Sequence, residues 1–418
     1  MEVSSRSFMT GMKRFAYAQL VHICISRFPL RTGRCHSMQS ILIDDLTESI
    51  TNCFLNEGVN MSIAVSIIGA SGAVGTTLAT HILRSDLLGP YDRLQLVGRG
   101  ISASTAKLLA TRIDLLDAFD DERVEIEVVP NIEDVDGDVV IVCAGNTISS
   151  KSMNRRELGA ANLPIFEHIA DACASRVPEA LFIVVSNPVE LGVEVFSNKL
   201  NRHRVLGMGA QQDSLRFARA IAKDLGISRY DVHASVLGEH GQAMVPLWST
   251  VELMLSDPAL EAVLSQLKEL SGAILLEERV AALQDQVSEL LRSAKIAEAY
   301  EITRRALPDA RILVEPMITG HTMHSTPNAT ANATLQCIAA AMMNDHRRIH
   351  GQVMLDGEFL NLNGVCGVPL NVNQEGWQVA QLDGLTANEQ IQVRSAAHSI
   401  RDYLSSVYST ADRLVEVQ

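Results

Sequence analysis

Three side chains in the middle of the sequence could together move a proton and hold a carboxylic acid. His240 lies in the tetrapeptide Gly-Glu-His-Gly at 238–241, and an imidazole exchanges a proton near neutral pH. A nearby carboxylate, for which Asp213 is the candidate, would fix the ring tautomer and stabilise the charged ring. Arg216 follows Asp213 by one helical turn and offers two parallel donors to an acid. These residue types suit the interconversion of a 2-hydroxy acid and a 2-oxo acid.

Each of these residues also has an ordinary structural interpretation. A lone histidine is more often structural or solvated than catalytic. Asp213 precedes an apolar helical segment, where an aspartate commonly caps the helix. Arg216 could equally be a solvated residue on the helix surface. The chemical interpretation therefore depends on finding these residues together with other motifs in a fixed order.

A glycine-rich turn lies far upstream of the histidine. Gly69, Gly72 and Gly75 separate an apolar β-type segment from a helical segment. The first glycine permits a tight turn, the second admits a pyrophosphate to the backbone, and the third lets the helix approach the sheet. The N–H groups at the helix start, including those of Ala73 and Val74, add partial positive charge. The turn predicts a dinucleotide-binding site.

The end of the second expected strand indicates which dinucleotide binds. An NAD site normally places an acidic residue there to hold the ribose hydroxyls. This chain reads Leu-Val-Gly-Arg-Gly at 96–100, and Arg99 could pair with a 2′-phosphate. The sequence therefore favours NADP over NAD. A solvated Arg99 in an enzyme that accepts both cofactors is the alternative.

Strand and helix segments alternate between residues 62 and 208. This pattern predicts an α/β fold built on a Rossmann doubly wound parallel sheet, with ligands at the carboxyl ends of its strands. The expected strands are 62–68, 93–97, 124–129, 139–143, 181–186 and 205–208, and the expected helices are 73–87, 104–116 and 153–175. The helix at 104–116 is expected to bury one face made of Leu108, Leu109, Ile113 and Leu116.

The alternation of strand and helix segments ends after residue 209, which predicts an α+β catalytic domain. Helices are expected at 213–225, 258–307 and 387–407, and antiparallel strands at 353–362 and 364–371. A short heptad pattern predicts a packing or subunit-contact helix, and its members are Val280, Leu283, Val287 and Leu290. The expected domains are a dinucleotide-binding domain at 61–208 and a substrate domain at 209–418.

Composition narrows the class of protein. The 418 residues carry a formal net charge of −14, which argues against a nucleic-acid partner. No apolar run is long enough for a membrane span, so no membrane partner is expected. The seven cysteines lack metal-ligand spacing, which disfavours a zinc site and fits a reducing compartment. The sequence therefore predicts a cytoplasmic protein without a metal.

Residues 1–60 differ from the remainder. They are serine-rich, carry six Lys or Arg against one acid up to Met38, and show no strand–helix alternation. One interpretation is an arginine-rich organelle transit peptide. The favoured one is a poorly ordered or mis-started leader, because the first dinucleotide strand follows directly after Met61.

From residue 62 to the C-terminus the chain resembles the malate/lactate dehydrogenases. The matching motifs occur in that family's order and cover about six-sevenths of the sequence. They read GASGAVG at 69–75, CAG at 143–145, MNR at 153–155, VSNPVE at 185–190, DSLRF at 213–217, GEHG at 238–241, VPLWS at 245–249 and GVP at 367–369.

The resemblance implies a catalytic role for each matching residue. His240 would exchange the proton, Asp213 would orient it, and Arg216 would bind the substrate carboxylate. Arg155, on a mobile loop, would close over the site and polarise the carbonyl. Asn187 would donate to the substrate or to the nicotinamide ribose, and Thr322 matches a position near the nicotinamide. The implied partner is a small 2-oxo or 2-hydroxy acid, and the implied assembly is a homodimer or homotetramer.

The loop before Arg155 departs from the family. Malate enzymes carry a further arginine there for the second carboxylate, whereas Ile148 or Ser149 stands at that place here. Lys151 could substitute as a point charge. The departure weakens the case for oxaloacetate as the substrate and favours a monocarboxylate or an acid with an unusual side group. Glu190 and Gln242 replace usual aspartates, which should not abolish the chemistry.

Two alternatives to the dehydrogenase remain. The first is a dinucleotide-binding sensor or scaffold that has lost its grip on a substrate, which the altered loop motivates. The second is a related NAD-dependent glycoside hydrolase. That class needs a metal held partly by a cysteine, and Cys143 and Cys173 lack a suitable histidine motif nearby.

Overall fold

The computed structural model describes residues 62–120, 123–146, 154–323, 325–343 and 347–416. The chain divides into two compact units, 1–63 and 64–418, and the described fold belongs to the second. The expected leader therefore lies outside the described residues. So does the loop at 147–153, with Ile148, Ser149, Lys151 and Met153.

The predicted doubly wound parallel sheet is confirmed. Six parallel strands lie in the order β3-β2-β1-β4-β5-β6. The direction in which the chain adds strands to the sheet switches between β1 and β4. Their apolar side chains are buried on both faces because helices cover both faces. The strands are β1 (Ala64–Ile68), β2 (Arg93–Val97), β3 (Glu125–Val129), β4 (Val139–Val142), β5 (Leu181–Val184) and β6 (Val205–Gly207).

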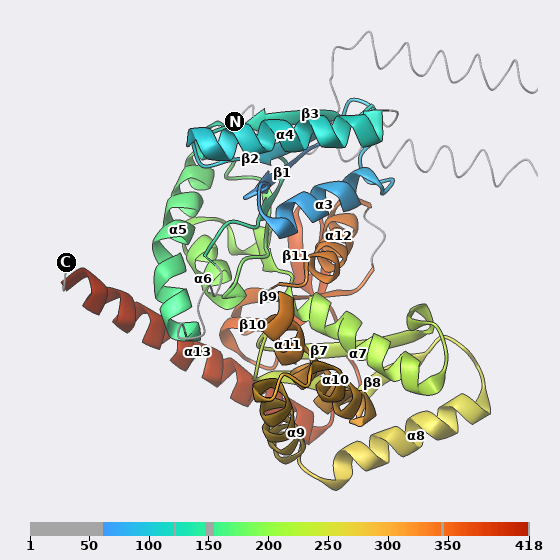
Figure 1. Cartoon of the computed structure of the whole chain (residues 1–418). Helices are drawn as coiled ribbons and strands as arrows, with labels where there is room; N and C mark the ends of the chain where they lie inside the picture. The colour runs from blue at the N-terminus through green and yellow to red at the C-terminus, as the bar shows by residue number, and fades with distance from the viewer. Residues whose placement is uncertain (1–61, 121–122, 147–153, 324, 344–346, 417–418) are drawn as a thin grey trace, which may run out of the picture. The chain divides into compact units, whose positions relative to one another are not determined.

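Four helices of the first half cover this sheet. They are α3 (Ala73–Leu83), α4 (Ser102–Phe119), α5 (Arg155–Arg176) and α6 (Val189–Lys199). A helix from the second half, α12 (Pro327–Met343), packs beside α3, as Figure 1 shows. The region beside the glycine turn at 69–75 is therefore built from two helices that are far apart in the sequence.

The face expected for the helix at 104–116 is buried only in part. Leu109 and Ile113 are 51% and 54% exposed, whereas Leu108 and Leu115 are buried. Arg112, between them on the same face, donates through Nε to the backbone oxygen of Ile126 at 2.6 Å. The helix α4 packs on the outer strands β2 and β3, so only a narrow stripe touches the sheet. Arg112 therefore lies on the sheet-facing side of α4, at a position that the apolar pattern did not include.

The second half extends the same sheet with antiparallel strands. Strand β6 pairs with β9 (Ile349–Asp356) through Gly207 and Gln352, and the order continues β9-β10-β7-β8, with β11 (Gly376–Val379) on β10. The other strands are β7 (Val232–Gly238), β8 (Met244–Leu253) and β10 (Asn363–Asn373). The two strands expected in this region are present with shifted bounds. Because one sheet runs through both halves, their division at residue 208 stays a proposal.

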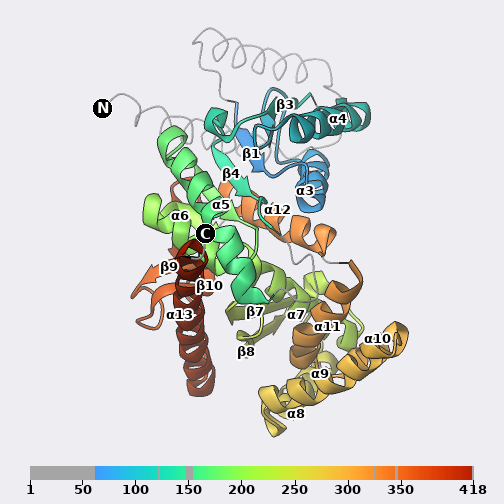
Figure 2. The same cartoon turned by 60° about the vertical axis from the view of Figure 1, so that its left-hand side comes forward.

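The expected helical region at 258–307 consists of three helices. They are α8 (Pro258–Ala273), α9 (Leu276–Arg292) and α10 (Ile296–Arg305), followed by α11 (Pro308–Met323). The heptad residues Leu283 and Val287 are buried in one cluster with side chains of α10 and α11. Figure 2 shows these helices together, and the long α13 (Ala387–Glu416) beside α5 and β10. None of the helices in the described part of the chain is long and apolar enough to cross a membrane.

A buried histidine on β9 should make stability depend on pH. His350 is 7% exposed, and its Nε2 lies 2.9 Å from the hydroxyl of Ser235. Burial, with a smaller effect of Arg348, lowers the pKa of His350 to about 3. The unfolded chain binds a proton at this residue near pH 6.5 and the folded chain does not, so stability falls as the pH drops through that window.

The test compares urea unfolding of the wild type and of His350→Gln at pH 7 and pH 5. Between pH 7 and pH 5, the free energy of unfolding of the wild type should fall by about 2 kcal/mol more than that of the variant, because only the wild type binds this proton on unfolding. Identical pH dependence in the two proteins would show that His350 is not buried in its neutral form.

Candidate active site

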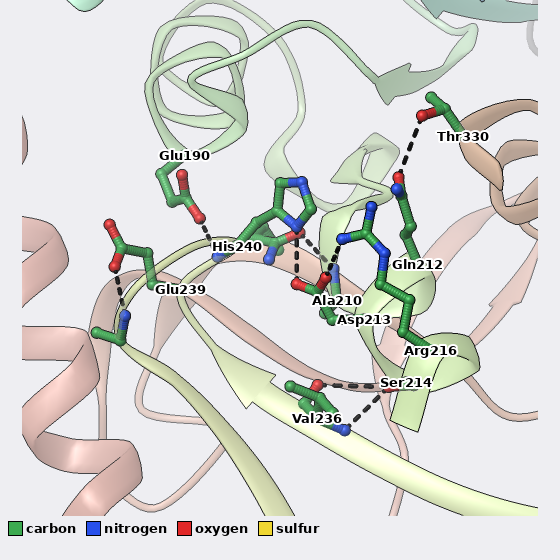
Figure 3. Close-up of polar contacts among 12 residues, drawn as sticks. Glu190, Ala210, Gln212, Asp213, Ser214, Arg216, Val236, Glu239, His240 and Thr330 are labelled. Atoms are coloured by element: carbon green, nitrogen blue, oxygen red, sulfur yellow. Dashed lines mark hydrogen bonds and ion pairs between the residues drawn. The ribbon is translucent and has the colours of Figure 1, made fainter. Parts of the chain in front are cut away.

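Three of the predicted residues form one connected cluster (Figure 3). The Nδ1 atom of His240 lies 2.7 Å from Oδ2 of Asp213, and Arg216 donates from NH1 to Oδ1 of the same carboxylate at 3.0 Å. Asp213 and Arg216 lie one turn apart on α7 (Gly209–Leu225), whereas His240 follows the end of β7. The bond to Asp213 leaves Nε2 as the ring nitrogen available for a substrate.

Backbone requirements at the glycines explain how His240 reaches α7. Gly238 and Gly241 have φ values of +85° and +154°, which other residues rarely adopt. At Gly209, a Cβ would lie 2.5 Å from Cβ and Cγ of His240. Only glycine there allows the start of α7 to approach the imidazole. Gly209 is a positioning residue that the motif analysis missed, although a glycine at a helix start is visible in the sequence.

The electrostatics of Asp213 suit the orientation of an imidazole. Complete burial by itself would raise the pKa of this carboxyl. The charges and hydrogen bonds of His240 and Arg216 outweigh burial and lower the pKa below its ordinary value. Asp213 therefore stays ionised and stabilises a protonated His240. Its side chain is 1% exposed, which shields this interaction from solvent screening.

The expectation that Arg155 lies on a mobile loop is wrong. Arg155 is the first residue of α5, because Asn154 and Glu157 form a capping box that starts the helix immediately before it. Its guanidinium pairs with Glu239 and, at 3.2 Å, with Glu190. It reaches His240 only through the backbone oxygen, at 3.5 Å. In this conformation Arg155 braces the turn that carries the histidine.

Glu190 and Glu239 are functional candidates that the sequence reasoning did not assign. Glu190 is fully buried and accepts the backbone N–H of His240 at 2.6 Å. Glu239 accepts the N–H of Ala243 at 2.8 Å. The ring of Tyr403 lies 4.6 Å from the Arg155 guanidinium, and its hydroxyl donates to the Arg155 oxygen. Glu239 stands next to His240 in the sequence, but nothing in the sequence indicated that it pairs with Arg155, 84 positions away.

The glycine turn is built to receive a dinucleotide pyrophosphate. Gly69 has φ +84°, and a Cβ there would lie 2.8 Å from the nitrogen of Ala144 on the neighbouring strand end. At Gly75 a Cβ would lie 2.6 Å from the oxygen of Gly69, so the third glycine lets α3 pack against the turn. Gly72 donates its N–H to the oxygen of Gly69 at 3.0 Å. The N–H groups in the first turn of α3, from the exposed Ala73 onward, have no partner within the helix and can meet an anion. These residues fit the phosphates of a nicotinamide dinucleotide.

The remaining predicted residues lie at the carboxyl ends of parallel strands, with one exception. Arg99 follows β2 and is exposed. Asn187 follows β5, and its backbone oxygen accepts from Nδ2 of the buried Asn162 at 2.7 Å. Asn162 also bonds Asn146 after β4, so it holds two of these strand ends together. The exception is Thr322, which lies on α11 with its hydroxyl bonded to Ile318, outside the cluster around His240.

Comparisons with known proteins agree with this arrangement. The family model for the lactate/malate dehydrogenase NAD binding domain matches residues 63–207, and the model for the lactate/malate dehydrogenase alpha/beta C-terminal domain matches 211–307. Malate dehydrogenase 1 of Aquifex aeolicus is 30% identical over 76% of this chain and 88% of its own. The L-2-hydroxycarboxylate dehydrogenase (NAD(P)(+)) of Methanocaldococcus jannaschii is 26% identical, covering 82% and 98%.

A solved structure shows the same fold. It is a lactate dehydrogenase from a Medee basin deep-sea metagenome, with a TM-score of 0.65 and 19% identity over 83% of this chain and 99% of that one. The chain belongs to the lactate/malate dehydrogenase family. It is an oxidoreductase that acts on 2-hydroxy and 2-oxo acids with a nicotinamide dinucleotide.

Proposed function

We propose that His240, Asp213 and Arg216 form the reaction centre of this dehydrogenase. Gly69, Gly72, Ala73, Val74 and Gly75 would hold the nicotinamide dinucleotide, which would supply hydride transfer. Nε2 of His240 accepts the hydroxyl proton during oxidation and returns it to the oxygen during reduction. The 2.7 Å contact between Nδ1 and Asp213 is the observation that carries this proposal, because it stabilises the ring in the charged state.

Arg216 binds the carboxylate of the substrate. Its side chain is 18% exposed and already oriented by Asp213, so the free guanidinium edge is available to an incoming acid. Asn187 donates to the substrate or to the ribose of the cofactor. Arg155 fixes the backbone of His240 and is a candidate for polarising the carbonyl after a change of partners. The intact cluster around His240 argues against a non-catalytic scaffold.

The preferred substrate is a 2-oxo acid other than oxaloacetate. The sequence lacks the arginine that malate enzymes carry before Arg155, and this absence supports a monocarboxylate or an acid with an unusual side group. A panel of 2-oxo acids assayed with NADH and with NADPH tests the assignment. Turnover with at least one acid is expected, and silence of the whole panel with both cofactors would refute dehydrogenase activity.

We also propose a preference for NADP, which rests on Arg99. This side chain is exposed after β2, where it can pair with a 2′-phosphate. Arg99→Asp should reverse the preference between the cofactors, since an aspartate repels the phosphate and accepts from ribose hydroxyls. The measurement is kcat/KM for NADPH and NADH in both proteins. An unchanged ratio would remove Arg99 from cofactor selection.

The organisation of the chain completes the proposal. Residues 61–208 form the dinucleotide-binding domain and 209–418 the substrate domain of a cytoplasmic homodimer or homotetramer. Exposed apolar side chains at the junction of α8 and α9 support self-association, since Leu270, Ile274 and Leu275 are each more than half exposed. Analytical ultracentrifugation tests the assembly, and a monomer at micromolar concentration would contradict it.

A further inference from the structure

A hollow of about 250 Å³ lies beside Arg216, between α7, α11 and α12. One face of α7 supplies Gln212, Arg216 and Arg219 to its wall. Arg229, from the short helical turn η4 (Arg229–Asp231), completes a set of three arginines. The hydroxyls of Thr319 and Thr326 and the amide of Asn332 line the other side. His240 is not among the lining residues, so the hollow adjoins the proton-transfer site without including it.

The charges in this hollow are not balanced. Arg216 is neutralised by Asp213, and Arg219 pairs with Glu315. Arg229 stacks its guanidinium 5.2 Å from the ring centre of Tyr230 and has no carboxylate partner within the described residues. The wall therefore carries an excess positive charge.

A second hollow of about 170 Å³ continues from the first and shares Arg219 and Glu315 with it. It adds Lys223 from the next turn of α7 and Arg304 from α10. Arg304 pairs with Glu301, whereas Lys223 is exposed and has no ion pair in the described part of the chain. The positive surface thus extends along α7 away from Arg216.

We propose that the hollow beside Arg216 binds a small anion that carries carboxylate or phosphate groups. Guanidinium groups bind such anions through paired, charge-assisted hydrogen bonds, and the Thr326 hydroxyl and the Asn332 amide can donate to the remaining oxygens. The Thr319 hydroxyl instead donates to the Glu315 backbone oxygen at 3.2 Å. The volume lies below the roughly 300–1,000 Å³ of pockets for drug-sized ligands, which suits a compact anion. Arg229 is the principal charge, because its guanidinium is not committed to a carboxylate.

The anion has two possible sources. It is either a second acidic group on the substrate, reaching past Arg216, or a separate ligand that binds next to the reaction centre. The first source rests on the dehydrogenase function proposed above, and the second does not. Both sources of the anion require the same residues of the hollow, and steady-state kinetics distinguishes one source from the other.

The test first measures binding without turnover. Thermal unfolding of the full chain is followed in rising concentrations of inorganic phosphate or citrate, with sodium chloride at matched ionic strength as the reference. A saturable rise in the midpoint is expected in the wild type. Arg229→Gln should weaken that apparent affinity about tenfold or more, the effect of losing a hydrogen bond to a charged group. Arg292→Gln, which removes an exposed charge from α9, should behave as the wild type.

Kinetics on the same variants then identifies the source. A higher KM for 2-oxo dicarboxylates in Arg229→Gln, with KM for short monocarboxylates unchanged, supports the substrate's second acidic group. If phosphate or citrate changes the kinetic constants of every substrate to the same extent, and Arg229→Gln loses this effect, the anion is a separate ligand. The proposal is overturned if neither anion binds saturably. It is also overturned if anion binding survives Arg229→Gln and simply competes with the substrate at Arg216.

Discussion

Replacement of His240 by asparagine should lower kcat by about 10²–10⁴-fold, the usual contribution of a positioned general acid–base group. Asparagine keeps a polar group beside Asp213 but cannot take up a proton. The effect should appear equally in kcat and kcat/KM, because the lost interaction belongs to the transition state. Stopped-flow measurement of nicotinamide absorbance at saturating substrate gives kcat for both proteins.

Cofactor binding provides the control for this variant. The imidazole bonds Asp213 rather than the glycine turn after β1, so titration of the variant with NADPH should give a dissociation constant close to that of the wild type. A variant that retains wild-type turnover would exclude His240 as the proton carrier. A variant that also loses cofactor affinity would indicate a damaged fold and calls for comparison with His240→Gln.

Replacement of Arg216 by lysine should raise KM strongly and lower kcat/KM by about 10²–10³-fold. Lysine keeps the charge but cannot offer two parallel donors to a carboxylate. It also weakens the contact that helps to hold Asp213, at 3.0 Å in the native protein. Loss of one member of a buried, hydrogen-bonded charge pair typically costs about 2–5 kcal/mol, or about 30- to 5,000-fold, a range that includes the expected reduction.

The matched control is Arg292→Lys, an equivalent change on an exposed position of α9. That variant should keep the kinetic constants of the wild type. For Arg216→Lys the decisive comparison is between substrates and analogues that lack the carboxylate. If both lose the same rate, Arg216 does not bind the acid and its contribution is structural.

The parallel sheet and the glycine turn could be predicted from the sequence because their determinants are local. Buried parallel strands read as short apolar runs, and Gly69 and Gly75 stand at fixed spacing between a strand and a helix. The pairing of His240 with Asp213 was also accessible, since both belong to motifs in a recognised order. Their 2.7 Å contact is the geometric consequence that the sequence could only suggest.

The parts that could not be predicted depend on contacts between distant residues. The ion pairs of Arg155 join residues 35 and 84 positions away, so nothing in its neighbourhood indicated that it braces the histidine turn. The buried stripe of α4 was misplaced because Arg112 bonds a backbone oxygen on the adjacent strand. Apolar periodicity treats an arginine as exposed, whereas Arg112 is only partly exposed and donates to the backbone of the sheet.

One sheet joins both halves of the molecule, through the pairing of Gly207 with Gln352 and the bond from the Ala210 nitrogen to the Gln352 side chain. A shared sheet disfavours a hinge motion between the two halves, because opening them would break this pairing. We therefore expect the acid to enter and the product to leave through local rearrangements of single segments rather than through separation of the two halves.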